Sequence, residues 1–343
     1  MLERELATTA AAMVAPGKGI LAIDESSGTI KKRFDSIALE STTESRRAYR
    51  DLLITAPGLS QFISGMILYD ETIKQATKDG TPFAAVLKKN GILAGIKVDT
   101  GAKALAGASS EQVTEGLDGL RERLAEYKKL GAAFAKWRAV INIGKDIPSA
   151  YCIDANAHAL ARYAALCQET GIVPIVEPEV LMDGDHTLER CYAVTEDTLE
   201  TLFHELRHQR VRADLLVLKA SMVIAGKNCP QQASVQQVAD ATVQCLKRTV
   251  PAAVPGIVFL SGGQSDELAT AHLNAMNAMG AAPPWPLSFS YGRALQAPAL
   301  KAWKGQAANV AAAQKALHHR AKCNSAACFG RYRPEMEKEA LAA

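Results

Sequence analysis

The sequence predicts an α/β fold, a single (β/α)8 TIM barrel that spans residues 1–343. Short apolar segments recur along the chain, and amphipathic helical segments fill the gaps between them, which is the pattern of repeated βαβ units. Several of these segments are apolar on both faces, as expected of strands inside a parallel sheet. The chain has no composition break and no Ser/Gly-rich linker, which favours one barrel over two doubly wound domains.

Each predicted strand is a short apolar run bounded by turn residues. The first run reads GILAID and leads into a stretch rich in Ser and Thr, whereas the last reads LSFSY and is followed by Gly and Arg. The eight predicted strands cover residues 19–24, 63–69, 93–99, 133–141, 172–177, 215–219, 257–261 and 287–291.

The predicted helices lie between these strands and combine leucines at helical spacing with charged residues. One of them stops at Gly171, a common residue at helix ends. The predicted helices cover residues 111–130, 156–170, 198–210, 235–250 and 306–322. Residues 304–343 are expected to form a helical tail, which could be mobile because the sequence turns polar around residues 330–333.

Composition excludes several classes of protein. The 39 Lys and Arg residues nearly balance the 36 Asp and Glu residues, so the net charge of +3 is too small for nucleic-acid binding by counterion release. The 7 cysteines are scattered without a C-x-x-C pair, which indicates reduced thiols inside a cell. The N-terminus lacks the apolar core of a secretory signal, and no segment is predicted to span a membrane. We expect a cytoplasmic protein with no nucleic-acid or membrane partner.

Polar side chains close, interrupt or directly follow most of the predicted strands. The active site of such a barrel lies at the carboxyl ends of its strands, so these side chains should gather there. A buried lysine is costly unless it is paired or neutral, and lysines inside apolar runs therefore indicate a function. The residues concerned are Asp24, Lys97, Lys136, Arg138, Glu177, Lys219, Ser261 and Arg293.

Lys219 is the best placed nucleophile, because it closes the run LLVLK and small residues follow it. A desolvated lysine near another cation has a lowered pKa and can attack a carbonyl to form a Schiff base. Lys136 could be that cation, and Glu177 could move protons to and from the imine. Phosphate binding would explain the remaining basic groups equally well, so the residues alone leave both interpretations open.

Two glycine-containing loops follow the last two predicted strands. Barrels commonly bind a phosphate with the backbone N–H groups of these loops, and an arginine adds charge and a forked donor geometry. Simple turn glycines explain either loop alone, but the two together favour an anion site. The loops contain Ser261, Gly262, Gly263, Ser290, Gly292 and Arg293.

A second anion site is expected just after the first predicted strand, near Ser26 and Thr29. Lys32 and Arg33 would supply its positive charge, although an ordinary solvated surface explains these two residues as well.

One motif is expected to be inactive. The segment from His204 to His208 matches H-E-x-x-H, which can hold zinc on a helix. It lies in a polar segment that a barrel would place on its outer ring, with no obvious third ligand, so we expect no metal site there. His318 and His319 are likewise expected to be exposed on a helix.

Seven segments at strand ends carry a resemblance to a known family. In order they read LAIDESSGTIKKR, GIKVD, AKWRAV, VPIVEPEVL, LVLKASMV, FLSGGQS and SFSYGRALQ. With them the chain resembles class I fructose-1,6-bisphosphate aldolases from about residue 19 to 303, and more weakly to about residue 322. The resemblance implies a barrel, usually a homotetramer, that uses a Schiff-base lysine and no metal or other cofactor. It also implies reversible cleavage of fructose 1,6-bisphosphate to triose phosphates in glycolysis and gluconeogenesis.

The resemblance further implies roles for single residues. Lys219 would form the imine with C2 of the ketose, Glu177 would act as general acid and base, and Asp24 would take the C4 hydroxyl proton. Lys136 would orient the substrate and help proton transfer. The phosphate nearest C1 would bind to Ser261, Gly262, Gly263, Ser290, Gly292 and Arg293. The C6 end would bind to Ser26, Thr29, Lys97 and Arg138, with Arg33 and Arg46 as more peripheral contacts.

Two departures from the family pattern lead to expectations. Ala220 and Ser221 follow the lysine where the family commonly has Pro and Asn, so we expect altered loop rigidity. Many members end in a tyrosine that assists proton exchange on the enamine, whereas the last tyrosine here is Tyr332. We expect enamine protonation to be slower or to use another group.

Two alternative functions remain open at this point. One is another Schiff-base lyase of the same fold, similar to transaldolase or deoxyribose-phosphate aldolase; two anion sites on opposite sides of Lys219 favour a bisphosphate substrate instead. The other is a scaffold that kept the barrel and lost its chemistry, against which the intact set of Asp24, Lys136, Glu177 and Lys219 argues.

Overall fold

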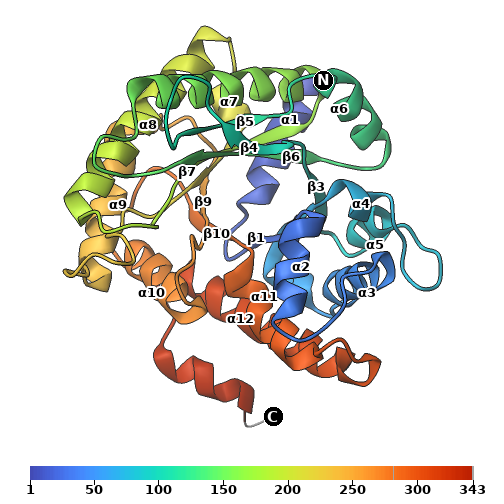
Figure 1. Cartoon of the computed structure of the whole chain (residues 1–343). Coiled ribbons are helices and arrows are strands. Elements are labelled where there is room, and N and C mark those ends of the chain that lie inside the picture. The colour runs from blue at the N-terminus through green and yellow to red at the C-terminus, as the bar shows by residue number, and fades with distance from the viewer. Residues whose placement is uncertain (281, 342–343) are drawn as a thin grey trace.

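The computed structural model describes residues 1–280 and 282–341, and its centre is a closed barrel of eight parallel strands (Figure 1). Around the barrel the strands follow the order β1-β10-β9-β8-β7-β6-β3-β2. The barrel strands are β1 (Gly19–Ala22), β2 (Ile63–Leu68), β3 (Leu93–Lys97), β6 (Phe134–Ile141), β7 (Val173–Val180), β8 (Val217–Ala220), β9 (Ile257–Phe259) and β10 (Leu287–Tyr291). The expected (β/α)8 architecture is confirmed.

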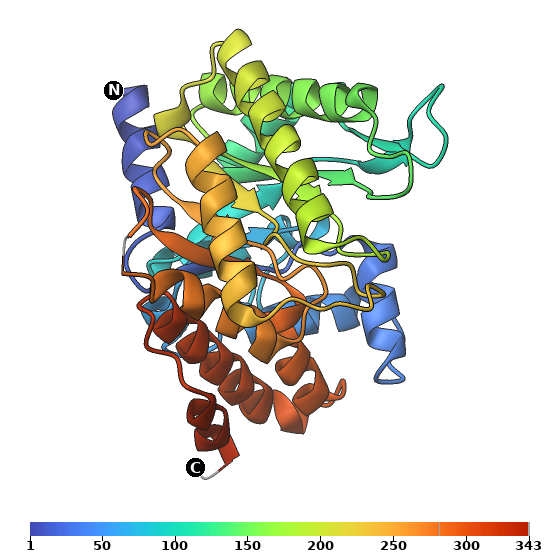
Figure 2. The same ribbon diagram turned by 90° about the vertical axis from the view of Figure 1, so that its left-hand side faces the viewer.

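Helices surround the barrel, and the long ones lie along its outer wall (Figures 1 and 2). The α-helices are α1 (Leu2–Met13), α2 (Ser27–Asp35), α3 (Thr43–Ile54), α4 (Asp70–Ile73), α5 (Phe83–Lys89), α6 (Leu120–Lys129), α7 (Ala150–Thr170), α8 (Leu188–His208), α9 (Val235–Thr249), α10 (Asp266–Asn277), α11 (Arg293–Trp303) and α12 (Val310–Ala327). Short 3-10 helices are η1 (Leu59–Gln61), η2 (Ala213–Leu215), η3 (Ala307–Asn309) and η4 (Pro334–Leu341). No helix among the described residues is long and apolar enough to cross a membrane.

The two-residue period of a strand divides each barrel strand between an inner and an outer face. On β6, Phe134 belongs to the inner apolar cluster together with Val173 of β7 and Val217 of β8. On the outer face Trp137 of β6 packs on Tyr163 of α7, with ring centroids 5.5 Å apart. The inner cluster also includes residues of α1, which therefore covers the amino-terminal end of the barrel.

All eight predicted strands are present, with small differences at their ends. The largest difference is in β7, which continues to Val180, three residues beyond the predicted end at Glu177. Because residues two apart share a face, this extension places Glu179 on the same inner face as Glu177.

The helix predicted over residues 111–130 is wrong in its first half. Residues Gln112–Glu115 form strand β5, which pairs antiparallel with β4 (Gly101–Ala104) in a hairpin outside the barrel. Gly116 has φ +129° and a Cβ there would lie 2.9 Å from the backbone nitrogen of Thr100, so this residue cannot continue a helix. Gly119 is left-handed at the N-cap of α6, and the helix begins only at Leu120.

The segment after the barrel folds back on the outer helices. Gly330 takes a left-handed turn at φ +64°, and the Tyr332 backbone N–H donates to Asn274 Oδ1 of α10 over 2.8 Å. The expectation that His318 and His319 are exposed is wrong: both are half-buried, and His318 packs against the Phe62 ring. Residues 342–343 of the predicted tail lie outside the described residues.

Candidate active site

A cavity of about 1010 Å³ opens at the carboxyl ends of the barrel strands. Most of the predicted site residues lie on the wall of this cavity. They come from seven of the eight strands and from the loops that follow those strands. Fourteen of them line the cavity, namely Asp24, Ser26, Thr29, Arg33, Lys97, Lys136, Arg138, Glu177, Lys219, Ser261, Gly262, Ser290, Gly292 and Arg293.

Four of these side chains form a continuous chain of ion pairs on the cavity floor. Lys219 Nζ lies 3.0 Å from Glu177 Oε1, and Lys136 Nζ lies 3.4 Å from Glu177 Oε2. Lys136 Nζ also lies 2.7 Å from Asp24 Oδ2. Glu177 therefore stands between two lysines, and Lys136 between two carboxylates, and the contact of Lys136 with Glu177 Oε2 is an ion pair without a hydrogen bond.

The strand period explains why these groups meet. Lys136 follows Phe134 by two residues on β6, and Glu177 follows Ile175 by two residues on β7, so both continue the inner face of the barrel. Lys219 follows Val217 of β8 in the same way. The barrel interior is thus apolar towards its amino-terminal end and charged at the opposite end.

Burial and pairing together set the charge states of the site. All four groups are at most 9% exposed, and burial alone would raise the pKa of a carboxyl group and lower that of a lysine. Burial raises the pKa of Asp24, but the Lys136 and Lys219 ammonium groups outweigh this effect and lower the pKa to about 2. The same two lysines also lower the pKa of Glu177, and the Asp24 and Glu177 carboxylates raise the pKa of Lys136 despite its burial. Asp24 is consequently ionised and Lys136 protonated at neutral pH.

One end of the cavity is formed by the loops after β9 and β10. Ser261 and Gly262 line it, and the Gln264 N–H donates to the Ser261 carbonyl to close a tight turn. Ser290 Oγ is buried without a hydrogen-bond partner among the described residues, and Arg293 begins α11. This end therefore offers hydroxyl groups, a glycine turn and a guanidinium, which suit an anion.

At the other end of the cavity Lys97 and Arg138 already have acidic partners. Lys97 Nζ contacts Asp99 Oδ1 at 2.6 Å, and Arg138 pairs with Glu179. Ser26 Oγ lies 3.2 Å from Thr29 Oγ1 at the start of α2. Arg33, also on α2, pairs with the buried Glu25 and reaches towards the opposite end, because a Cβ at Gly292 would lie 3.8 Å from its Nη2. An anion at this end would have to compete with carboxylates that the protein supplies.

Two of the predicted site residues do not line the cavity. Arg46 of α3 makes a two-pronged contact with Glu71, with nitrogen-to-oxygen distances of 2.8 and 2.6 Å. Gly263 lies behind the turn at φ +97°, where a Cβ would be 3.0 Å from Lys227 Nζ and 3.2 Å from Arg293 Nη2.

The sequence prediction missed the acidic partners Glu25, Asp99 and Glu179, as well as Lys227. A signal was available for Glu179, because the alternation in EPE continues the inner face of the strand past Glu177. Lys227 gives no such signal, because only the fold brings its loop next to Gly263.

The H-E-x-x-H segment lies on the outer helix α8, as expected. The rings of His204 and His208 are 4.3 Å apart, while Glu205 pairs with His158 of α7 over 3.0 Å. Within the part of the chain that the structure describes, no third acidic, His or Cys group joins these two rings in a metal-ligand cluster.

Fold and cavity together define a class of protein, a TIM-barrel lyase that acts on phosphorylated sugars. A family model described as "Glycolytic: Fructose-bisphosphate aldolase class-I" matches residues 5–343. The chain belongs to the class I fructose-bisphosphate aldolase family. Its reaction is the reversible cleavage of fructose 1,6-bisphosphate to dihydroxyacetone phosphate and glyceraldehyde 3-phosphate in glycolysis and gluconeogenesis.

Individual relatives agree over nearly the whole chain. A protein of Xanthomonas campestris named "Probable fructose-bisphosphate aldolase class 1" is 64% identical, with 96% of this chain and 98% of the relative aligned. A fructose-bisphosphate aldolase of Dictyostelium discoideum is 54% identical over 96% of this chain and 93% of its own length. Among solved structures, a Plasmodium falciparum fructose-bisphosphate aldolase in complex with TRAP and a small molecule inhibitor superposes with a TM-score of 0.95. It is 50% identical, with 97% and 96% of the two chains covered.

Proposed function

We propose that cleavage proceeds through an imine on Lys219, with Glu177, Lys136 and Asp24 moving the protons and no metal taking part. The observation that carries this proposal is the unbroken chain of contacts from Lys219 through Glu177 and Lys136 to Asp24. A Schiff-base mechanism independent of metal is the chemistry of the class I family to which the chain belongs.

The first stage joins Lys219 to C2 of the ketose. Glu177 Oε1 lies 3.0 Å from Lys219 Nζ and takes a proton from the ammonium, which frees the amine to attack the carbonyl carbon. The attacking nitrogen then loses a proton to the former carbonyl oxygen, which gives the neutral carbinolamine. Its hydroxyl receives the first proton back from Glu177 and leaves as water, so a protonated C–N double bond replaces C2=O. Once Glu177 has given up this proton, the protonated Lys136 compensates its negative charge.

The second stage breaks the C3–C4 bond. Asp24 is ionised and accepts the proton of the C4 hydroxyl, so C4 becomes the aldehyde carbon of glyceraldehyde 3-phosphate. The bonding electrons move into the protonated imine and leave an enamine on Lys219. Lys136, 2.7 Å from Asp24, orients this carboxylate and can pass the proton back towards Glu177.

The enamine must then be protonated at C3 before dihydroxyacetone phosphate is released by hydrolysis. Tyr332 is 8% exposed, and its hydroxyl donates to Glu337 Oε1 over 2.8 Å. It is absent from the described lining of the cavity. We assign this proton transfer to a group other than Tyr332.

The two ends of the cavity are assigned to the two phosphates. The phosphate nearest C1 binds to the turn of Ser261 and Gly262, with Gly263 behind it, and to Ser290, Gly292 and Arg293. The phosphate nearest C6 binds to Ser26, Thr29, Lys97 and Arg138, with Arg33 and Arg46 more peripheral. Among the described residues Arg293 has no carboxylate partner, whereas Lys97, Arg138 and Arg33 each have one.

We further assign the protein to the cytoplasm as a homotetramer that binds phosphorylated ketoses and triose phosphates. None of the seven cysteines, all within the described residues, forms a disulfide, and six of them are buried, which suits a reducing compartment. The tetramer and the choice of partners rest on membership of the family.

The Asp24→Asn variant tests the division of labour between the two stages. Removing the base should lower the rate of C3–C4 cleavage by about 10²–10⁴-fold. Imine formation on Lys219 should persist, because it depends on Glu177. Rapid quenching with borohydride measures imine formation, and a coupled triose phosphate assay measures cleavage. Loss of both signals in the folded variant would contradict the proposed roles.

A further inference from the structure

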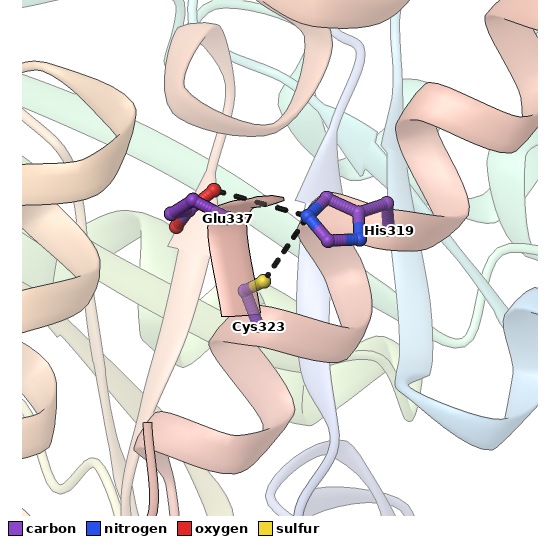
Figure 3. A group of neighbouring side chains, drawn as sticks. All are labelled: His319, Cys323 and Glu337. Carbon is purple, nitrogen blue, oxygen red and sulfur yellow. Dashed lines mark hydrogen bonds and ion pairs between the residues drawn. The ribbon is translucent and has the colours of Figure 1, made fainter. Parts of the chain in front are cut away.

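Three side chains form a cluster where η4 packs on α12, in the last part of the chain (Figure 3). His319 and Cys323 stand four residues apart on α12, so they share one face of the helix. Glu337 of η4 faces them across the contact. None of the three lines the active-site cavity as the structure describes it.

We propose that His319, Cys323 and Glu337 form a binding site for a zinc ion. One potential ligand atom from each side chain lies within 4.8 Å of the other two. His319 Nε2 is 3.6 Å from Cys323 Sγ and 3.8 Å from Glu337 Oε2. Zinc binds sulfur at about 2.3 Å and imidazole nitrogen at about 2.0 Å, so a tetrahedral centre separates these two atoms by about 3.5 Å. The His319–Cys323 spacing fits that edge, whereas Glu337 lies within 4.8 Å of Cys323 and must move towards it when the ion binds.

The donor set also selects the metal. Thiolate and imidazole favour zinc over magnesium or calcium, which prefer oxygen ligands. Cys323 is fully buried, while the His319 and Glu337 side chains are 14% and 17% exposed. Three protein ligands leave one position of a tetrahedral zinc ion for a water molecule.

The surroundings hold Glu337 in position. Arg320 pairs with both of its oxygens, and the Tyr332 hydroxyl donates to Oε1 over 2.8 Å. Carboxylate ligands of metals are commonly oriented by such partners, and a carboxylate has enough lone pairs to accept Arg320 while Oε2 turns to the ion. Zinc binding converts the Cys323 thiol to a thiolate, which offsets part of the added charge beside Arg320.

A zinc ion at this position would tie the last turn of the chain to α12 and leave the active site untouched. The site therefore predicts an effect on stability and none on turnover. At a zinc concentration 100 times Kd, the melting temperature should rise by about 4 °C in a chain of this length.

The test uses the full-length protein, first freed of metal with EDTA under reducing conditions and then dialysed. Zinc binding is measured by calorimetry, and cobalt substitution is followed by the near-ultraviolet absorption that a cobalt–thiolate bond produces. The wild type should bind zinc in a 1:1 ratio and show the cobalt–thiolate band. The Cys323→Ser and His319→Gln variants should each lose more than about 100-fold in affinity, because outer partners alone cost about 10–100-fold.

Cys328→Ser and His318→Gln are matched controls, because both residues lie at or beside the same helix and outside the cluster. They should bind zinc like the wild type. Circular dichroism of every variant in EDTA shows whether it is folded. Absence of zinc binding in the wild type, or binding that survives in both folded ligand variants, would overturn the proposal. Aldolase turnover measured in EDTA tests the imine mechanism separately.

Discussion

The two ends of the barrel interior are built from the same strands and serve opposite purposes. Towards the amino-terminal end, Phe134, Val173 and Val217 form a dry apolar cluster with α1. Two or four residues further along these strands, Lys136, Glu177 and Lys219 are almost as deeply buried, yet charged. The first set can stabilise the fold by removing apolar surface from water, whereas the second costs desolvation energy that ion pairs only partly offset. The barrel thus separates stability from chemistry along the length of each strand.

Lys219→Met, at the charged end of the barrel, should have the largest effect on catalysis. The substitution keeps the volume of the side chain and removes the nucleophile, so kcat should fall by at least about 10⁴-fold. The melting temperature should also fall, because Glu177 loses its partner at 3.0 Å and removing one partner of a buried ion pair is destabilising. Steady-state cleavage and thermal unfolding measure the two quantities, and a folded variant with more than a tenth of normal turnover would contradict the assigned role.

Phe134→Ala is the converse substitution at the apolar end. Gly65 and Gly95 leave room for this ring, because a Cβ at either position would lie within 2.8 Å of it. Removing the ring leaves a cavity that the neighbouring glycines cannot fill, and the free energy of unfolding should fall by about 3–5 kcal/mol. The kcat of the folded fraction should stay near normal. The exposed Phe329→Ala is a matched control with a smaller loss in denaturant unfolding.

His272 of α10 allows the cost of burying an ionisable group outside the cavity to be tested through pH. Burial lowers the pKa of this histidine to about 4, from 6.5 in an exposed site. In the unfolded chain this histidine is protonated below about pH 6.5, whereas in the folded chain it is protonated only below about pH 4. The wild type should lose about 2 kcal/mol of stability between neutral pH and pH 5 through this group. In His272→Gln this part of the loss should disappear. Denaturant titrations at pH values from 7.5 to 5 measure the free energy of unfolding. A variant that loses as much stability as the wild type over this range would contradict the burial effect.

Truncation after Tyr332 should have the smallest effect on chemistry. Tyr332 stays in the shortened chain, but Arg320 loses Glu337, and its buried guanidinium is left without that carboxylate. We expect a lower melting temperature with turnover within about twofold of normal, because removing one partner of a buried pair is destabilising. A large loss of cleavage rate in the folded truncated protein would show that the removed residues take part in catalysis.

The periodicity of the chain predicted the barrel because buried parallel strands leave a strong local signal. The same signal located Lys136, Glu177 and Lys219, whose charge is conspicuous inside apolar runs. Strand β5 falls within the helix predicted over residues 111–130, because the leucines of α6 that follow it mask the break at Gly116.

Other features depend on contacts between distant segments. The resemblance to the family implies a substrate contact for Arg46, and its pairing with Glu71 appears only in the fold. The His319–Cys323 spacing is visible on a helical wheel, but the turn at Gly330 that brings Glu337 back to α12 is a tertiary property. Local patterns cannot specify such contacts.

The central claim is that Lys219 is the nucleophile at the charged end of the barrel. Borohydride reduction in the presence of fructose 1,6-bisphosphate and excess EDTA, followed by peptide mass mapping, tests it most directly, since reduction fixes an imine on the lysine that formed it. The account predicts a substrate adduct on Lys219 alone. An adduct on Lys136 or Lys97 instead, or no adduct from protein that cleaves the substrate under the same conditions, would contradict it.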